Sequence, residues 1–237
     1  MSALLAITRK ELKSYFVSPL AYVFLSAFLF LSGIYFLLGL TLTGEASLRV
    51  MLSNLAITLV FVIPLLTMQL FAGEQRRGTL EMLLTAPVPL HALVFGKWLA
   101  AVLLCCLMLV GTGVFPLALS IYGDPDWGVL FTSYFGLICV VCSFCAAGLF
   151  ASTLTDDSVA AGLIGIVVLL PFWLFGQFAA IAKTGWVREV LQHAALLPHL
   201  KSFSRGILDT ADLTYFAAFT LAFLFLTWRA MESRRWR

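Results

Sequence analysis

Long apolar stretches alternate with short charged segments along this chain. Six stretches reach or approach the roughly 20 residues that a helix needs to cross a hydrocarbon core of about 30 Å. They cover residues 20–43, 50–73, 98–122, 128–154, 158–182 and 212–229. The apolar runs are continuous, whereas a membrane-spanning β-strand alternates apolar and polar residues. The pattern therefore predicts an all-α, polytopic membrane protein with six transmembrane helices.

The composition supports the same class of protein. Of 237 residues, 62% are hydrophobic and 11% are charged, whereas a soluble domain carries about 25% charged residues. The mean hydropathy is +1.02. No polar domain or linker-like segment interrupts the chain, so residues 1–237 are expected to form a single transmembrane domain.

The positions of the cations predict the topology. With six spans, both termini lie on one side of the membrane, and this side receives ten of the 15 Lys and Arg residues: Arg9, Lys10, Lys13, Arg76, Arg77, Lys97, Arg229, Arg234, Arg235 and Arg237. The other side receives five: Arg49, Lys183, Arg188, Lys201 and Arg205. Cytoplasmic segments carry the excess of Lys and Arg. We therefore expect a multi-pass protein of the cell (inner) membrane with cytoplasmic N- and C-termini.

Residues 3–16 have the pattern of an amphipathic helix on the membrane surface. One side of this helix would be apolar, with Lys10 and Lys13 opposite, and the apolar set is Leu4, Leu5, Leu12, Tyr15 and Phe16. Glu11 interrupts the pattern. We expect the helix to lie along the cytoplasmic face of the membrane. The alternative is a solvated tail with anchoring charges.

The segment between Lys183 and Asp212 carries four cations on the expected outer side. It contains one apolar stripe at helical spacing, formed by Trp186, Val187, Val190 and Leu191, and a second formed by Phe203, Ile207 and Leu208. Pro198 stands between the two stripes. Two short interfacial helices, separated at Pro198, are therefore expected at the outer face.

Residues 72–88 combine a charged start with a short apolar helix. Thr79 can cap this helix, and Glu81 lies in its first turn, where a negative charge suits the helix dipole. Its apolar residues are Leu80, Met82, Leu83 and Leu84. A short helix of this kind at the cytoplasmic surface would suit docking of a partner. An ordinary cytoplasmic hairpin with orienting arginines is the alternative.

This segment resembles the signature loop of type-2 ABC transporter permeases. The similarity is carried by Glu74-Gln75-Arg76-Arg77-Gly78-Thr79-Leu80-Glu81 and by Leu83-Leu84-Thr85-Ala86-Pro87-Val88. The chain is most similar to the small six-span permeases of the gliding-motility and copper-enzyme-maturation kind. The resemblance extends over nearly the whole chain and includes Arg9-Lys10-Glu11-Leu12, the stretch 198–208 and the arginine-rich end.

The resemblance implies that this is the permease subunit of an ATP-driven exporter. In such permeases the loop after the second span forms a cytoplasmic coupling helix that contacts a separate ABC ATP-binding subunit. The coupling residues would be Glu74, Arg76, Arg77, Gly78, Thr79 and Glu81. Six spans make half of the usual exporter, so a second permease copy is implied, as a homodimer or a heterodimer.

Enzymatic motifs are missing from the sequence. No G-x-x-x-x-G-K-[ST] phosphate loop occurs, and Gly96-Lys97 precedes Trp98. The chain is therefore not expected to be an ATPase, to carry a catalytic site or to hold a cofactor. Its cations lie between membrane spans, which excludes nucleic-acid binding as their purpose. The alternatives to a permease are a multipass channel and a membrane-embedded enzyme, each without an ATPase partner.

Five cysteines lie within the apolar stretches. Cys139, Cys142 and Cys145 follow each other at intervals of three residues, and thiolates favour Cu(I). Cysteine is also a small apolar residue that packs well between membrane helices, so we expect packing rather than a metal site or a disulfide. His91, His193 and His199 are expected to be loop residues without a partner motif, and none of them is expected to be catalytic. The substrate cannot be deduced from spans that consist of Leu, Val, Phe and Ala.

Overall fold

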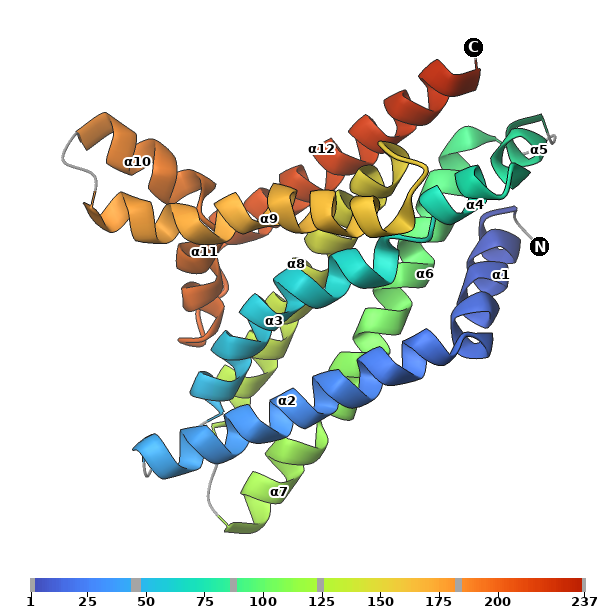
Figure 1. Cartoon of the computed structure of the whole chain (residues 1–237). Coiled ribbons are helices and arrows are strands. Elements are labelled where there is room, and N and C mark those ends of the chain that lie inside the picture. The colour runs from blue at the N-terminus through green and yellow to red at the C-terminus, as the bar shows by residue number, and fades with distance from the viewer. Residues whose placement is uncertain (1–2, 44–47, 86–88, 123–125, 182–184, 236–237) are drawn as a thin grey trace.

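The computed structural model describes residues 3–43, 48–85, 89–122, 126–181 and 185–235. Within these ranges the chain is almost entirely helical and contains no strand. The helices, labelled in Figure 1, are α1 (Ala3–Val17), α2 (Pro19–Thr43), α3 (Arg49–Thr67), α4 (Ala72–Arg76), α5 (Thr79–Thr85), α6 (Leu90–Gly111), α7 (Val114–Tyr122), α8 (Trp127–Thr153), α9 (Ser158–Ile181), α10 (Gly185–Ala194), α11 (Leu196–Phe203) and α12 (Thr210–Arg235).

Six segments of the described chain are long and apolar enough to span a membrane, as predicted. Four of them are single helices that match the predicted spans closely: α2, α8, α9 and α12. The predicted second and third spans each include two helices. The all-α, polytopic fold is confirmed.

The predicted second span, 50–73, is wrong as a single helix. Helix α3 ends at Thr67, and the chain turns before α4 begins at Ala72. The Leu70 amide donates to the Thr67 carbonyl over 3.1 Å in this turn. Hydrophobicity alone could not indicate the turn, because its residues Met68, Leu70 and Phe71 are as apolar as the helix before them.

The third span begins earlier than the predicted residue 98 and is interrupted. Pro89 caps α6, which starts at Leu90, and the chain leaves the helix at Thr112 and Gly113 before α7 begins. Pro116 lies four residues after Thr112. A proline has no N–H to donate, and its ring crowds the carbonyl four residues back. The interruption therefore follows from Pro116.

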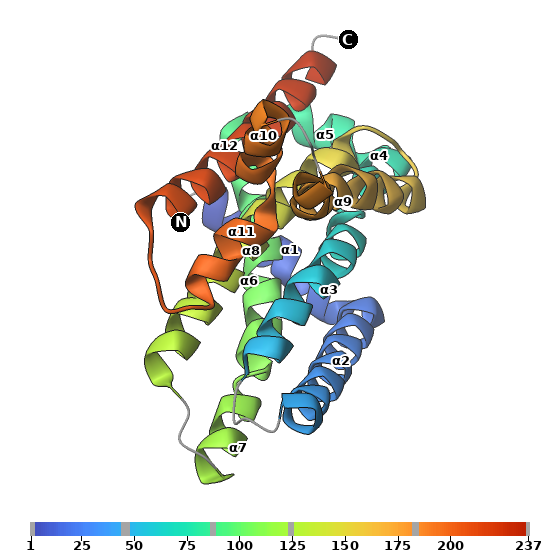
Figure 2. The same cartoon turned by 90° about the vertical axis from the view of Figure 1, so that its left-hand side faces the viewer.

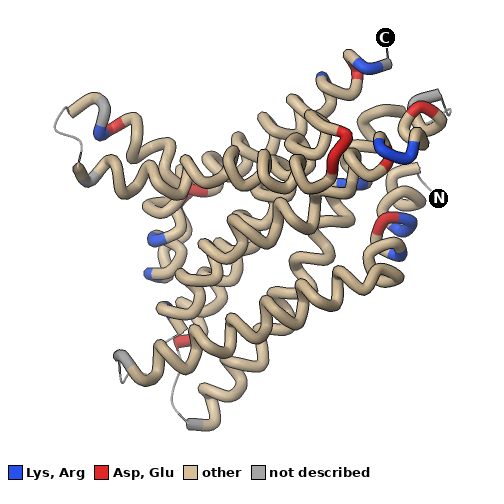
Figure 3. The backbone as a smooth tube through the Cα atoms, in the orientation of Figure 1, with Lys and Arg blue, Asp and Glu red and all other residues tan. Residues whose placement is uncertain are grey.

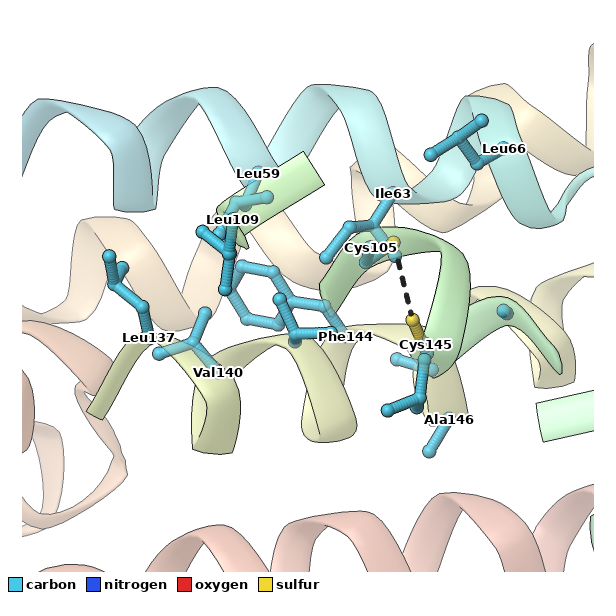
Figure 4. Packing of buried hydrophobic residues seen from close by; sticks show 14 of the residues in the cluster. Leu59, Ile63, Leu66, Cys105, Leu109, Leu137, Val140, Phe144, Cys145 and Ala146 are labelled. Atoms are coloured by element: carbon cyan, nitrogen blue, oxygen red, sulfur yellow. Dashed lines mark hydrogen bonds between the residues drawn. The ribbon is translucent and has the colours of Figure 1, made fainter. Parts of the chain in front are cut away.

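Helix α8 is the centre of the bundle. It packs against α3, α6, α9 and α12. Figure 4 shows Phe144 and Val140 of α8 facing Leu109 of α6 and Leu59 of α3. The Cys145 and Cys105 sulfurs also meet in this apolar layer, 3.9 Å apart. The predicted packing role of these two cysteines is consistent with this position.

The bundle has two charged ends and an apolar middle. In Figure 1, α1, α4, α5 and the end of α12 gather towards the right and upper right, while α7 lies at the opposite end. Figure 2 also shows α7 far from α4, α5 and the end of α12. Figure 3 shows that Lys, Arg, Asp and Glu concentrate towards the ends of the helices. Both ends of the described chain therefore lie on one side of the bundle. The predicted cations Lys183 and Arg237 lie outside the described residues.

Two short helices precede the last span, as predicted, but Pro198 does not separate them. It lies in the first turn of α11, where a proline fits because the amides of that turn have no partner within the helix. Phe203 is fully buried against the bundle, while Ile207 and Leu208 follow the helix and are exposed. The predicted second stripe is therefore wrong.

The three histidines lie in helices, so their predicted position in loops is wrong. His91 lies in α6, His193 in α10 and His199 in α11. The His199 Nδ1 atom is 2.6 Å from the buried Asp212 carboxylate, and its ring stacks on Tyr215 with 4.2 Å between centroids. This contact joins α11 to the start of α12.

Candidate functional site: the α4–α5 segment and its buried support

The segment with the predicted coupling residues forms two short helices joined by a tight turn. Gly78 has φ +67°, a conformation that costs glycine little and other residues about 1–2 kcal/mol. Its amide donates to the Gln75 carbonyl over 3.0 Å and closes the end of α4. Thr79 starts α5, and its hydroxyl donates to the Glu74 carbonyl over 3.3 Å. The glycine and the threonine thus hold α4 and α5 against each other.

One side of this segment is exposed. Arg76, Arg77, Thr79 and Glu81 are all exposed, and Met82 retains 75% of its accessible surface. By contrast, Leu80 is buried and anchors α5. The exposed side therefore presents two guanidinium groups, a carboxylate and an apolar side chain. Such a mixture is typical of surfaces that bind other proteins.

Glu74 has a different position from the other predicted coupling residues. Its side chain is buried, and its Oε1 atom lies 2.9 Å from the Nζ atom of Lys97. Lys97 lies on α6 and is completely buried. The Glu74 carboxylate therefore faces the interior of the helix bundle.

Lys97 joins three separate parts of the chain. Its Nζ atom is 3.1 Å from Glu11 Oε1 on α1, 2.9 Å from Glu74 Oε1 on α4, and 2.7 Å from the Leu70 carbonyl after α3. The Phe71 ring lies 5.1 Å away, within the range of a cation–π contact. An ammonium group has three N–H donors, so these three oxygen contacts match its capacity. We call Lys97, Glu11, Glu74 and the Leu70 carbonyl the Lys97 cluster.

Helix α1 lies directly on α6 beside this cluster. A Cβ atom on Gly96 would be 2.9 Å from Ile7 Cγ2, so only glycine permits this approach without movement. The Thr8 hydroxyl contacts the Gly96 carbonyl at 3.2 Å. Thr8 and Glu11 are the buried residues of α1. Glu11 therefore interrupts the amphipathic pattern because it faces the bundle and not the solvent. The predicted amphipathic helix exists, with Leu5 and Val17 exposed.

Tyr15 joins α1 to the end of α3. Its hydroxyl donates to the Leu66 carbonyl over 3.0 Å. Burial, with smaller contributions from neighbouring thiols and from Glu11, raises the pKa of Tyr15 well above its usual value. The phenol therefore remains neutral and acts as a donor at physiological pH. Helix α1 is thus bonded to α3, α4 and α6.

A second set of contacts joins α4 to the α8–α9 turn and to the end of α12, at the same end of the bundle. The Gln75 amide fits between the Thr155 carbonyl, 3.0 Å from its nitrogen, and the Arg234 guanidinium, which faces its oxygen. Arg234 also donates to the Thr153 carbonyl over 2.8 Å. A groove of about 820 Å³ runs beside these residues and is lined by Glu81 and Asp156 as well. The exposed side of α4–α5 therefore continues onto the α8–α9 turn and α12.

The Lys97 cluster is not among the features predicted from the sequence, where Lys97 serves only to orient the chain and Glu11 only interrupts the amphipathic pattern. Two signals could have suggested the pairing: Lys97 lies within an apolar run, and Glu11 lies at the apolar side of an amphipathic helix. A buried lysine needs an acidic partner, and Glu11 and Glu74 are acids on the same side of the predicted membrane.

The cysteines belong to the bundle interior. Cys145 is buried against Cys105, while Cys139 and Cys142 are partly buried on α8. Among the residues that the structure describes, no three His, Cys, Asp or Glu side chains come together as a metal site would require.

Comparison with known proteins identifies the family. The family model described as "ABC-2 family transporter protein" matches residues 5–231, which is nearly the whole chain. A search of curated proteins finds no match. The match includes α1, the α4–α5 segment, the Lys97 cluster and all six spans. The chain therefore belongs to the ABC-2 transporter family, whose members are the membrane components of ABC transporters.

Proposed function

We propose that this chain is the permease subunit of an ATP-driven exporter and that a separate ABC ATP-binding subunit docks on the exposed side of α4–α5. One observation carries the proposal: α4 has an exposed side for a partner and a buried side bonded into the bundle. Arg76 and Glu81 are exposed, whereas Glu74 is buried against Lys97. A force applied to the outside of this segment would therefore reach α1 and α6 directly.

The predicted coupling residues divide into three roles under this proposal. Arg76, Arg77 and Glu81 would contact the partner, together with the exposed Met82. Gly78 and Thr79 would hold the turn between α4 and α5. Glu74 would transmit the movement to Lys97 instead of contacting the partner.

The proposed topology places α4–α5 and both termini in the cytoplasm, where ATP is available. The excess of Lys and Arg at this end supports this orientation. We also propose that two permease copies form the exporter, because each chain supplies six spans. Exposed apolar faces on α2 and α9, with Phe30, Leu37, Val159 and Val167 among their residues, provide surface for a second copy or for lipid.

Charge reversal at the proposed docking surface tests the function. The double substitution Arg76→Glu and Arg77→Glu should lower the permease-stimulated ATPase activity of the co-purified partner by at least about tenfold, since like-charge contacts at an interface cost several kcal/mol. Both side chains are exposed, so the thermal unfolding midpoint should stay within about 2 °C of wild type.

A matched control reverses two exposed cations at the opposite end. Lys201→Glu with Arg205→Glu makes the same change in charge and should leave the stimulated ATPase activity intact. Equal ATPase activity in both double variants would remove α4–α5 as the docking site. Repeated purification of the chain without any Walker-motif ATPase would instead favour a channel.

A further inference from the structure

A cavity of about 340 Å³ lies between α1, the start of α2, the end of α3 and the α4–α5 segment. Its walls differ in chemistry. Helices α2 and α3 contribute Phe24 and Leu65, whereas α1 and the segment around α4 contribute Lys10, Ser14 and Arg77. The cavity therefore lies where an apolar span meets a charged end, which is the depth of a phospholipid headgroup on either side of a membrane.

The polar wall suits a phosphate group. Lys10 is at the rim, with 62% of its side chain exposed, and its ammonium group lies 3.5 Å from Glu11 and 3.4 Å from Glu74, which leaves its solvent side for an anion. Arg77 is exposed and donates its Nε hydrogen to the Gly73 carbonyl over 2.9 Å, which leaves the terminal amino groups for an anion. Lysine and arginine are the usual ligands of phosphate groups, and basic pockets between transmembrane helices bind lipid headgroups.

Glu74, which also lines the cavity, has one unused oxygen. Its Oε1 atom receives both Lys97, at 2.9 Å, and Lys10, at 3.4 Å. The Oε2 atom is buried and has no hydrogen-bond partner among the described residues. A buried acceptor without a donor costs about 1–3 kcal/mol, and more for a charged group. The cavity thus combines two cations for an anion with an acceptor that needs an N–H or O–H donor.

We propose that this cavity binds the headgroup of an aminophospholipid, phosphatidylethanolamine. The phosphate lies between Lys10 and Arg77, the primary ammonium group donates to Glu74, and the acyl chains follow the apolar wall of α2 and α3. Bound there, the lipid contacts α1 and the α4–α5 segment together. The lipid thereby stabilises their packing around the Lys97 cluster. The site lies within this chain alone, so lipid binding can be measured without a partner, although Arg77 at its edge is also one of the residues proposed to contact the ATPase subunit.

Phosphatidylcholine provides a direct comparison. It has the same phosphate and the same net charge, but its quaternary ammonium group has no N–H to donate. The full chain, purified in mild detergent without any partner, is titrated with the dioleoyl form of each lipid, and bound lipid is measured by native mass spectrometry. Phosphatidylethanolamine should bind about tenfold more tightly, which corresponds to one hydrogen bond to a charged group.

Three variants separate the contributions. Glu74→Gln should reduce the preference between the two lipids to about twofold, because the remaining acceptor is neutral. Arg77→Gln should weaken both lipids equally, since both carry the phosphate. Arg76→Gln changes the exposed neighbouring arginine, which does not line the cavity, and should behave as wild type.

Two results would overturn the proposal. One is equal binding of the two lipids by the wild-type chain. The other is an unchanged preference in the Glu74→Gln variant. If Glu74→Gln does not yield folded protein, Arg77→Gln decides on its own, because unchanged binding of both lipids would exclude the cavity as the phosphate site.

Discussion

Lys97→Met is the most informative single change in this permease. Methionine is close to lysine in length and fills a similar volume, so it preserves the packing against Phe71. It removes the charge that Glu11 and Glu74 share, at 3.1 and 2.9 Å. The two buried carboxylates then keep only the largely exposed Lys10 as a cationic partner, at the longer distances of 3.5 and 3.4 Å.

The size of the effect follows from these distances. Each ion pair corresponds to a gross attraction of about 5–6 kcal/mol at an effective dielectric constant near 20. Desolvation of the charged groups offsets much of this attraction. Removing one partner alone leaves the desolvation of the others uncompensated, which costs roughly 3–5 kcal/mol. This energy includes the loss of the hydrogen bond from Lys97 to the Leu70 carbonyl. We therefore expect Lys97→Met to destabilise the protein by about 4 kcal/mol.

Thermal unfolding in mild detergent measures this effect. A thiol-reactive dye reports unfolding, because Cys105 and Cys145 are buried in the native bundle. About 4 kcal/mol lowers the midpoint by roughly 10 °C for a chain of this size. Lys13→Met removes an exposed cation of α1 and should shift the midpoint by less than about 2 °C. A Lys97→Met midpoint as close to wild type as that of the control would refute the reasoning.

Two glycines give further predictions. Gly96→Ala places a methyl group 2.9 Å from Ile7 and should displace α1 from α6. This displacement should lower both the thermal unfolding midpoint and the partner's stimulated ATPase activity. The control Gly33→Ala meets only ordinary contacts, the nearest at 3.7 Å, and should change neither quantity. Gly78→Val should cost about 1–2 kcal/mol by its positive φ alone, measured by the same unfolding assay, because no atom lies within 4 Å of its Cβ position. Gly78→Asn should cost less, since asparagine tolerates this conformation.

The six spans could be predicted from the sequence because hydrophobic length is a local property. Local hydrophobicity could not predict where the helices within these spans end or are interrupted. The turn after Thr67 is apolar except for Gln69, so hydrophobicity did not separate it from the helix before it. The break at Thr112 and Gly113 depends on Pro116, whose effect falls four residues earlier in the chain. Pro198 was expected to separate two helices, but it lies in the first turn of α11.

The coupling segment could be found from its residues, but not its internal partners. Arg76 and Glu81 are exposed, as a docking role requires. The direction in which Glu74 points depends on Lys97, 23 positions later, and on Glu11, which belongs to a different helix. The sequence can suggest that Lys97 needs an acidic partner, but which acids reach it is decided by the packing of the bundle.

The triple variant Lys97→Met, Glu11→Gln and Glu74→Gln separates stability from transmission. Replacing a buried ion pair on both sides is often close to neutral in free energy, so this variant should recover most of the thermal midpoint lost by Lys97→Met alone. Apolar contacts between helices are non-directional and tolerate sliding, whereas hydrogen-bonded charges fix the relative position of α1, α4 and α6. If the Lys97 cluster serves to transmit movement, the triple variant regains its stability while the stimulated ATPase activity stays low. Recovery of both together would reduce the cluster to a packing element.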